Sequence, residues 1–470
     1  MADSFFGTEN LEEFKEWIKT QKVAVLGMGV SNTPLILYLS DLGVEVTVFD
    51  KATEEALGKR LEAFKKKKVS FSLGNDYLKK LKGFDLVFKT PGIRPDVPEL
   101  LEAEKEGARL TSEMEVFFEF CPAEIFAVTG SDGKTTTTTI IHRLLTEAGY
   151  KTWLGGNIGT PLLNRIDEIT KTDKVVLELS SFQLQTMKRS PHVAVITNVS
   201  PNHLDYHTSM DEYVEAKKNI FRYQTAADLV ILNADNELTS EMADEAPGEV
   251  LFFSRQKELE QGAFLSGDNL CWQDSGGLEA LTDKATVLLP GDHNVENYLA
   301  AIAATRNYVT RETVHKTAGT LKSIEHRIEF VRELNGVKYY NDSIGSSPSR
   351  TIATLNAFNH KVVLIAGGYD KKIPYDPLGD VLAQKVRHLI LIGETAGLIE
   401  MAITRRLRGK NQYNDIRITH CGTLEQAVNT AFFSAKPGEV VLLSPASASF
   451  DMFRNFEERG NAFKAFVNKL

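Results

Sequence analysis

Ile125-Phe126-Ala127-Val128, followed by Thr129-Gly130-Ser131-Asp132-Gly133-Lys134-Thr135-Thr136, carries the strongest structural prediction in this chain. An apolar strand breaks here into a glycine loop, and a threonine-rich helix follows. Glycine lets backbone N–H groups turn toward phosphate oxygens, and the helix N-terminus adds a partial positive charge. In such a loop Lys134 neutralises phosphate charge and the Thr135 hydroxyl can ligate Mg²⁺. The stretch therefore predicts an α/β domain whose loop, residues 130–136, binds a nucleoside triphosphate.

The loop is shorter than the full G-x-x-x-x-G-K-[ST] pattern. Val128 occupies the position of the first glycine, and the nearest glycine is Gly130. A glycine turn that carries Lys and Thr by chance is the alternative interpretation. The preceding strand, the following helix and the Gly-Lys-Thr order favour nucleotide binding.

Length and composition indicate a globular protein of several domains. The chain has 470 residues, which predicts about three domains. Hydrophobic residues make up 42% and charged residues 25%, which are ordinary values for a globular protein. The formal net charge of −9 argues against binding to nucleic acid or to an anionic membrane surface, since both require a basic face.

Cysteine usage and the N-terminus predict a cytoplasmic protein that does not insert into membranes. Cys121, Cys271 and Cys421 are odd in number and widely spaced, which fits neither a disulfide framework nor a zinc site. Residues 1–4 lack a basic segment, and no run of eighteen apolar residues occurs. We also expect a monomer.

The N-terminal segment has the order of a Rossmann-like unit. An apolar strand, residues 23–26, runs into Gly27-Met28-Gly29, and a second strand, residues 44–49, ends in Asp50. An acid at this place meets a ribose or base in such folds. Asn32 stands where a dinucleotide site has its third glycine, so NAD or FAD binding is disfavoured.

Further apolar strands extend this α/β pattern along the chain. Each is short and followed by a turn or a helical segment, as in a parallel sheet covered by helices. They are residues 86–88, 175–177, 193–196, 362–366, 389–392 and 440–443. Asn335-Gly336 between two apolar runs predicts a type I′ hairpin. Residues 249–289 indicate a small antiparallel segment before a helix near His293.

Two strand ends carry candidate metal ligands. Glu178 directly follows residues 175–177, at the sheet edge where the phosphate loop lies, so it is suited to Mg²⁺. A surface glutamate at a strand end is the alternative. His203 follows the next strand, but Mg²⁺ prefers oxygen ligands, and Asp205 and His207 are equal candidates there.

Several polar turns are candidate binding segments with ordinary structural alternatives. Asn157 lies in a glycine-rich turn that can hold a substrate or be a plain surface turn. Asn294 and Asn297 are one helical turn apart, which suits a nucleotide or a helix cap. The loop of residues 444–451 offers backbone N–H groups that suit a carboxylate, with Lys371 as a cation from a neighbouring turn.

Seven motifs together resemble one family, the Mur ligases. They are Thr129 to Thr136, Glu178 to Leu184, Asn198 to Asp205, His293-Asn294, His326-Arg327, Asn341-Asp342-Ser343 and Ser444 to Phe456. Residues 180–183 and 444–460 are most similar to the members that add D-glutamate to UDP-N-acetylmuramoyl-L-alanine. The resemblance implies ATP-dependent amide-bond formation through an acyl phosphate, in cytoplasmic peptidoglycan precursor synthesis.

The resemblance also implies a fold of three domains. Residues 1–112 are expected to form a Rossmann-like UDP-binding domain, and residues 113–325 a central ATP-binding domain with a parallel sheet. Residues 326–470 are expected to form a second Rossmann-like domain, which binds the amino acid.

Two Mg²⁺ ions are implied by the same resemblance. Thr135 and Glu178 would hold one ion, and His203 and Lys217 would hold the second. The family carbamylates the lysine that matches Lys217, which gives the side chain oxygen ligands. Residue patterns alone do not choose Lys217 over the adjacent Lys218.

Ligand-binding residues carry over by position from the family. Lys134 and the loop amides would hold the β- and γ-phosphates, and His326 would lie by the transferred phosphate. The other expected nucleotide residues are Asn294, Asn297, Arg327 and Asp342. Those expected to contact the UDP-linked acceptor are Val30, Ser31, Asp50, Thr90, Pro91, Gly92, Asn157, Ser180 and Gln183. Those expected to hold D-glutamate are Ser346, Lys371, Ser449 and Phe456.

One position departs from the family pattern. Many members have a lysine where this chain has Ile344, within Asn341-Asp342-Ser343-Ile344-Gly345-Ser346-Ser347. The local contacts to the amino acid are therefore expected to differ, and Arg350 is a candidate substitute. A ligase for another amino acid, a folate polyglutamate synthase, an ATP-hydrolysing switch and a Rossmann oxidoreductase are the alternative functions.

Overall fold

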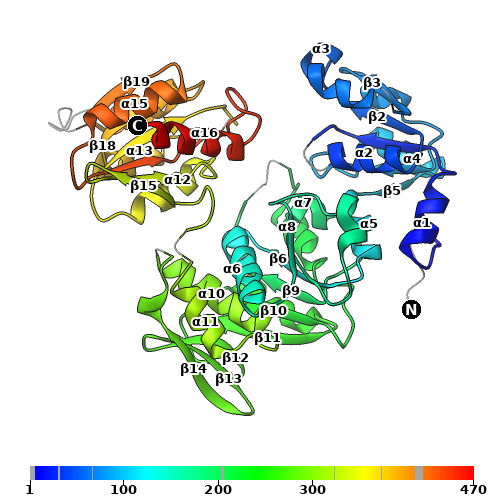
Figure 1. Cartoon of the computed structure of the whole chain (residues 1–470), viewed down its shortest axis with the longest axis horizontal. Coiled ribbons are helices and arrows are strands. Elements are labelled where there is room, and N and C mark those ends of the chain that lie inside the picture. The colour runs from blue at the N-terminus through cyan, green and yellow to red at the C-terminus, as the bar shows by residue number, and fades with distance from the viewer. Residues whose placement is uncertain are drawn as a thin grey trace. The chain divides into compact units, whose positions relative to one another are not determined.

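A computed structural model describes residues 6–29, 32–65, 67–202, 206–289, 291–321, 323–371, 373–407 and 416–470. The protein is a mixed α/β structure of three domains, each built around one sheet (Figure 1). The chain divides into two compact units, residues 1–287 with 292–318 and residues 288–291 with 319–470. The first unit contains two of the sheets. The domain limits at residues 112 and 325 stay predictions.

The first sheet is parallel and five-stranded, in the order β3-β2-β1-β4-β5. Its glycine turn leaves β1 at the centre, as the Rossmann-like pattern predicts. Asp50 is the last residue of β2. The elements are α1 (Leu11–Ile18), β1 (Val23–Leu26), α2 (Asn32–Asp41), β2 (Val46–Asp50), α3 (Glu54–Leu57), η1 (Gly58–Phe64), β3 (Val69–Leu73), η2 (Tyr77–Lys80), β4 (Leu86–Phe88), α4 (Pro98–Lys105) and β5 (Arg109–Thr111).

The central sheet has nine strands in the order β14-β13-β12-β11-β10-β9-β6-β8-β7. The strands from β7 to β12 pair in parallel, and β12, β13 and β14 are antiparallel. The predicted antiparallel segment is therefore confirmed for β12 to β14, whereas β11 continues the parallel sheet. Helices α6 and α10 pack side by side over this sheet (Figure 1).

The central domain supplies the strand ends and helices of the candidate site. Its elements are α5 (Glu113–Phe120), β6 (Glu124–Thr129), α6 (Lys134–Glu147), β7 (Thr152–Gly156), η3 (Leu163–Glu168), β8 (Lys174–Glu178), α7 (Ser181–Leu184), β9 (Val193–Ile196), α8 (Met210–Lys218), β10 (Leu229–Asn233), α9 (Glu237–Ser240), η4 (Glu241–Glu245), β11 (Glu249–Ser254), β12 (Gly262–Ser266), β13 (Asn269–Asp274), β14 (Gly277–Asp283), η5 (Lys284–Thr286), α10 (Asp292–Thr305) and α11 (Arg311–Ala318).

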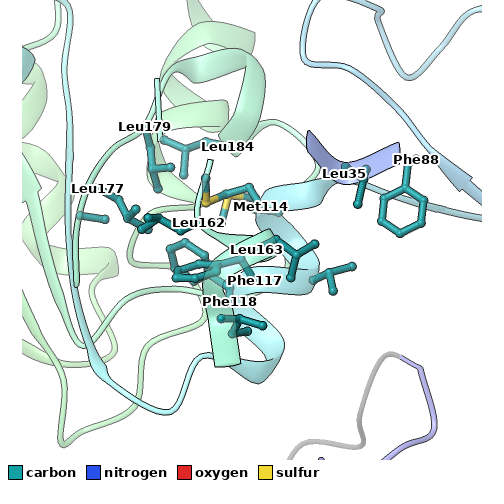
Figure 2. Close-up of a cluster of buried hydrophobic side chains, with 14 of the residues drawn as sticks. Leu35, Phe88, Met114, Phe117, Phe118, Leu162, Leu163, Leu177, Leu179 and Leu184 are labelled. Atoms are coloured by element: carbon teal, nitrogen blue, oxygen red, sulfur yellow. The ribbon is translucent and has the colours of Figure 1, made fainter. Parts of the chain in front are cut away.

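One hydrophobic cluster runs through both sheets of the first unit. Leu35 and Phe88 belong to the first domain, while Met114 and Phe117 on α5 pack toward Leu177 of the central sheet (Figure 2). Burial of this apolar surface stabilises the two domains together. The cluster explains why they fall within one compact unit.

The second unit contains a six-stranded sheet in the order β15-β16-β20-β17-β18-β19. Only β15 and β16 are antiparallel, and they form the predicted hairpin, with Asn335 and Gly336 at φ 54° and 76°. Positive φ at both turn residues is the type I′ geometry. The elements are β15 (Glu329–Leu334), β16 (Val337–Asn341), α12 (Pro348–Asn356), β17 (Val362–Gly367), α13 (Leu378–Lys385), β18 (Val386–Ile392), α14 (Ala396–Leu407), β19 (Arg417–His420), α15 (Leu424–Ser434), β20 (Val440–Leu443) and α16 (Phe456–Lys469).

No helix in the described ranges combines the length and apolar character needed to cross a bilayer. All three cysteines lie in described ranges, and each is a free thiol.

Candidate active site

The phosphate loop leaves β6 and enters α6 through two glycines that no other residue could replace without strain. Gly130 and Gly133 have φ values of 147° and 81°. A Cβ on Gly130 would lie 1.9 Å from Thr197 Oγ1, and one on Gly133 would lie 2.4 Å from Asn297 Oδ1. The loop backbone is therefore packed closely on its neighbours, as a phosphate cradle requires.

The loop is held in shape by the residues after β9. Ser131 N donates to the carbonyl oxygen of Asn198 at 2.9 Å, and Asp132 N donates to its side-chain Oδ1 at 3.0 Å. Lys134 Nζ donates to the carbonyl oxygens of Gly130 and Ser131 at 2.8 and 3.0 Å. The lysine is thus folded back along the loop and held by its carbonyls.

Thr135 on α6 and Asn157 after β7 both contact Glu178 at the end of β8. Glu178 is the last residue of β8 and is 2% exposed. Its Oε2 accepts from Thr135 Oγ1 at 2.6 Å, and its Oε1 accepts from Asn157 Nδ2 at 2.7 Å. A hydroxyl beside a carboxylate at a phosphate loop fits Mg²⁺, which is bound by one or two carboxylates and by substrate phosphates.

The described residues contain no cluster of three or more His, Cys, Asp or Glu side chains that would form a metal site on their own.

Lys217 contacts the same loop. It sits near the end of α8, is 1% exposed, and donates from Nζ to the carbonyl oxygen of Gly130 at 2.8 Å. Burial, together with the charge of Lys134, holds the pKa of Lys217 well below its usual value, against the opposing effect of Asp132 and Glu178.

The structure distinguishes Lys217 from the lysine that follows it. Lys218 points away and forms ion pairs with Glu215 at 2.9 Å and Glu245 at 2.6 Å. Lys134, Thr135, Glu178 and Lys217 are called the phosphate-loop cluster below.

Asn294 and Asn297 lie on the first turns of α10, against the start of α6. Asn297 Nδ2 donates to Asn294 Oδ1 at 3.0 Å, and its Oδ1 accepts from Thr137 Oγ1 at 3.2 Å. Both side chains are buried. The structure therefore brings this pair to the phosphate loop.

Ser180 and Gln183 form a capping box at the start of α7. Gln183 N donates to Ser180 Oγ at 3.3 Å, and Ser180 N donates to Gln183 Oε1 at 3.0 Å. These side chains thus have a local structural role, which the Ser-x-x-Gln spacing of a capping box signals.

Asp50 and Thr90 of the first domain both lie next to its glycine turn, residues 27–29. Asp50 accepts from Met28 N at 2.7 Å and from Ala52 N at 2.8 Å. Thr90, just after β4, is so close to the turn that a Cβ on Gly27 would lie 3.5 Å from its Cγ2. Val30 and Ser31 lie outside the described residues.

His203 and Asp205 also lie outside the described residues. His207, the third candidate from the sequence, is 1% exposed. Its Nε2 is 2.9 Å from Ser181 Oγ, and its ring stacks on Phe182. His207 is therefore part of the packed framework next to α7.

In the second unit, His326 and Asp342 are buried near the end of the hairpin. His326 has φ 61°, and its Nδ1 is 2.9 Å from Asn341 Nδ2. Burial, aided by the charge of Lys464, lowers the pKa of His326. Asp342 Oδ2 accepts from Thr354 Oγ1 and Ser444 Oγ, both at 2.7 Å.

Burial raises the pKa of Asp342 to about 6, and the charge of Arg327 opposes that rise. Ser346 and Ser449 belong to two loops near Asp342, and Lys371 and Phe456 contact the first of these loops. Lys371 Nζ donates to Ser346 Oγ at 3.3 Å, and the Phe456 carbonyl accepts from Ser343 Oγ at 2.8 Å. Ser449 is buried. Residues 341–346 and 444–449 are called the C-terminal loops below.

Arg459 ties the C-terminal loops together and was missed in the sequence. It is on α16 and fully buried, and it donates to the carbonyl oxygens of Ser343 at 2.8 Å and Ala448 at 3.0 Å. Its Nε donates to Ser343 Oγ at 3.0 Å. The sequence signal for this role was its place within residues 444–460, the stretch that resembles the D-glutamate-adding members of the family.

Three family models cover most of the chain. They are the MurD-like N-terminal domain of Mur ligases at residues 21–112, the Mur ligase middle domain at 128–305 and the Mur ligase glutamate ligase domain at 326–447. A UDP-N-acetylmuramoylalanine–D-glutamate ligase from Acetivibrio thermocellus is 60% identical over 460 residues, which are 98% of this chain and 99% of that relative.

The chain belongs to the Mur ligase family. A second relative of the same name, from Ruminiclostridium cellulolyticum, is 55% identical over 98% of this chain and 99% of its own length. Among solved structures, the UDP-N-acetylmuramate–alanine ligase of Thermotoga maritima matches with a TM-score of 0.61 at 20% identity, covering 96% of this chain and 99% of that one. That similarity supports the Mur ligase fold.

In this Mur ligase the sequence-predicted residues in the described ranges fall mainly into three groups. One group lies at the phosphate loop and comprises Lys134, Thr135, Asn157, Glu178, Lys217, Asn294 and Asn297. A second group, from the C-terminal domain, lines or holds the C-terminal loops. Asp50 and Thr90 form a third set, around the glycine turn of the first domain. Their roles toward ligands stay predictions.

Proposed function

We propose that this Mur ligase joins D-glutamate to UDP-N-acetylmuramoyl-L-alanine, with conversion of ATP to ADP and phosphate, in peptidoglycan precursor synthesis. The observation that carries the reaction class is the convergence of Lys134, Lys217, Thr135 and Glu178 on one glycine loop. The choice of amino acid is supported by the name of relatives that are 60% and 55% identical over nearly the whole chain.

The reaction proceeds in two balanced steps. The acceptor carboxylate attacks the γ-phosphorus, the bond from phosphorus to the ADP oxygen breaks, and an acyl phosphate forms. The amine of D-glutamate then attacks the acyl carbon, the bond to the phosphate oxygen breaks, and the nitrogen loses a proton. Bound ATP supplies the phosphoryl group, and Mg²⁺ offsets the charge on its phosphates.

The chain's own residues act by positioning and by charge. Lys134 and the N–H groups of the loop would hold the β- and γ-phosphates, and Thr135 with Glu178 would hold one Mg²⁺. Asn294, Asn297, Arg327 and Asp342 would contact or orient the nucleotide, and His326 would lie by the transferred phosphate. The buried contacts of Asp342 favour an orienting role.

We assign the second Mg²⁺ to His203 and a carbamylated Lys217. Carbamylation forms a bond from the neutral Nζ to the carbon of CO₂, moves one electron pair onto oxygen and releases a proton. The proposal is supported by the burial of Lys217 against the loop, where a carbamate anion would lie beside the cation of Lys134. A ¹³C carbamate resonance after addition of ¹³C-bicarbonate is expected in the wild type and in K218A, and is absent in K217A.

The remaining ligand contacts follow the three domains. The UDP-linked acceptor would contact Val30, Ser31, Asp50, Thr90, Pro91, Gly92, Asn157, Ser180 and Gln183. D-Glutamate would contact Ser346, Lys371, Ser449 and Phe456, because a dicarboxylate requires a cation and hydrogen-bond donors.

We further propose that the protein is a monomer and that it is cytoplasmic. The three free thiols suit the reducing cytoplasm. Analytical ultracentrifugation tests the oligomeric state.

ADP release tests the proposed function. The assay contains UDP-N-acetylmuramoyl-L-alanine, ATP and Mg²⁺, with D-glutamate, L-glutamate, L-lysine or meso-diaminopimelate added separately. ADP is expected only with D-glutamate. Turnover with another amino acid would assign a different ligase activity, and equal turnover without an amino acid would indicate an ATP-hydrolysing switch.

A further inference from the structure

Arg94 connects the turn after β4 with the central domain. It follows Thr90-Pro91-Gly92-Ile93, and its side chain is 23% exposed. Its Nη2 lies 3.1 Å from Glu212 Oε1 at the start of α8, and its Nη1 donates to the carbonyl oxygen of Tyr206. Asp96 accepts from Arg94 Nε at 2.9 Å and Nη2 at 2.8 Å, which fixes the plane of the guanidinium.

Tyr206 adds a second connection between the same segments. Its hydroxyl donates to the carbonyl oxygen of Pro91 at 3.1 Å. Its ring centroid is 4.3 Å from that of Phe182 on α7, and the guanidinium of Arg94 lies 5.5 Å from the ring. The turn of residues 90–93 is therefore held against α7 by one hydrogen bond and one aromatic contact.

Glu212, the partner of Arg94, is on α8 and accepts further hydrogen bonds. Its Oε1 also accepts from Gln185 Nε2 at 2.7 Å, and its Oε2 accepts from Thr208 N at 2.6 Å. The next residue, Tyr213, contacts the phosphate loop through a hydrogen bond of 2.9 Å between its hydroxyl and Ser131 Oγ. Lys217 is further along the same helix. Helix α8 thus contacts two segments. Through Glu212 it contacts Arg94, which follows the turn of residues 90–93, and through Tyr213 it contacts the phosphate loop.

We infer that Arg94 and Glu212 are positioning residues of the acceptor site, which fix the separation between the turn that meets UDP and the loop where the acyl group reacts. This inference rests on the proposed function. A UDP-linked acceptor is one long anionic molecule whose two ends must be held at once. The geometry of the Arg94–Glu212 pair therefore acts on acceptor binding and on the alignment of its carboxylate with Lys217.

A second ion pair joins the same two domains without touching these loops. Lys15 on α1 lies 2.6 Å from Asp167 on η3. If domain cohesion were the only role of Arg94, loss of either pair would have similar consequences. Lys15→Ala is therefore the matched control.

Steady-state kinetics with each substrate varied in turn test the inference. R94A is expected to raise KM for UDP-N-acetylmuramoyl-L-alanine about tenfold, while KM for ATP stays within about twofold. R94K, which keeps the charge but loses the planar fork, is expected to recover part of the loss. K15A is expected to keep all three KM values. R94A with E212Q is expected to be no worse than R94A, because the two residues act as one unit.

The results separate the two hypotheses. Wild-type protein that forms no product would contradict the proposed function itself. Active wild type with an unchanged acceptor KM in R94A, or an equal rise of all KM values in R94A and K15A, would overturn the positioning role. If R94A does not fold, as judged by thermal unfolding, E212Q carries the same test: an unchanged acceptor KM in folded E212Q overturns the inference.

Discussion

The phosphate-loop cluster and the C-terminal loops use charged side chains in opposite ways. In the cluster, Lys134 and Lys217 both donate to carbonyls of the loop, and Glu178 meets Thr135, so candidate ligand-binding groups converge. At the C-terminal loops, Asp342 in the first loop and Arg459 on α16 are buried, and each holds one loop to the other. Charged groups in the first region gather around one loop, where we propose that a ligand binds, whereas those in the second region hold backbone segments together.

The largest expected effect separates two adjacent lysines on α8. K217A is expected to lower kcat about a thousandfold, since it removes a group aimed at the phosphate loop. K218A, which removes only ion pairs to Glu215 and Glu245, is expected to stay near wild-type activity. Ligation rates under saturating substrates measure both, and equal effects of the two substitutions would contradict the assignment.

The second prediction concerns Arg459, whose buried guanidinium donates to the C-terminal loops. R459M leaves the carbonyls of Ser343 and Ala448 without their donor, so the free energy of unfolding is expected to fall by about 3 kcal/mol. KM for D-glutamate is expected to rise, while KM for ATP changes less. Urea unfolding and kinetics measure these effects. R454A, which breaks a surface pair with Glu458, is the control, and an R459M protein as stable as R454A would refute the account.

The third prediction concerns the pH dependence of stability that Asp342 gives to the C-terminal loops. Because the pKa of Asp342 is raised from 3.8 to about 6, the native state binds more protons than the unfolded state between those values, so stability falls as pH rises through that window. D342N lacks this titration. The stability of wild type relative to D342N is expected to decline by an amount on the order of 2 kcal/mol from pH 4 to pH 6.

Chemical unfolding at several pH values measures this difference. The exposed Asp376, replaced by Asn, serves as the control. A wild-type advantage over D342N that is constant from pH 4 to pH 7 would show that Asp342 carries no such titration.

The smallest predicted effect concerns Arg350, near the family lysine position occupied by Ile344. Arg350 Nη1 lies 3.5 Å from the Ile344 carbonyl, at the limit of a hydrogen bond. If it substitutes for the lysine, R350A raises KM for D-glutamate about threefold, as expected for a partly exposed charge contact. An unchanged KM for D-glutamate would eliminate this role.

The sequence predicted the phosphate-loop cluster better than the C-terminal loops. The strand, the glycines and Lys134 are adjacent along the chain, and Glu178 ends a recognisable strand, so local rules were sufficient. Lys217 and Lys218 could not be separated, because the rotation of α8 against the loop is set by tertiary packing. Arg459 was missed because its partners lie on loops distant in the sequence and are carbonyl groups, which leave no sequence pattern.

The fold was predictable to a similar degree. The type I′ turn at Asn335 and several parallel strands, such as β1, β6, β17 and β20, follow from local chemistry and apolar runs. Strands such as β3 and β19 were missed, because each contains residues with mixed burial and lies at a sheet edge. The shared hydrophobic cluster of the first unit depends on long-range packing that no single motif indicates.

The transfer of oxygen from the acceptor tests the account most directly. UDP-N-acetylmuramoyl-L-alanine labelled with ¹⁸O in its carboxyl group would be incubated with ATP, Mg²⁺ and D-glutamate, and the released phosphate analysed by mass spectrometry. If the phosphate-loop cluster activates the carboxylate for attack by the amine, one ¹⁸O atom appears in phosphate for each amide formed. Phosphate without ¹⁸O would show that ATP is hydrolysed by water, and would contradict the ligase mechanism.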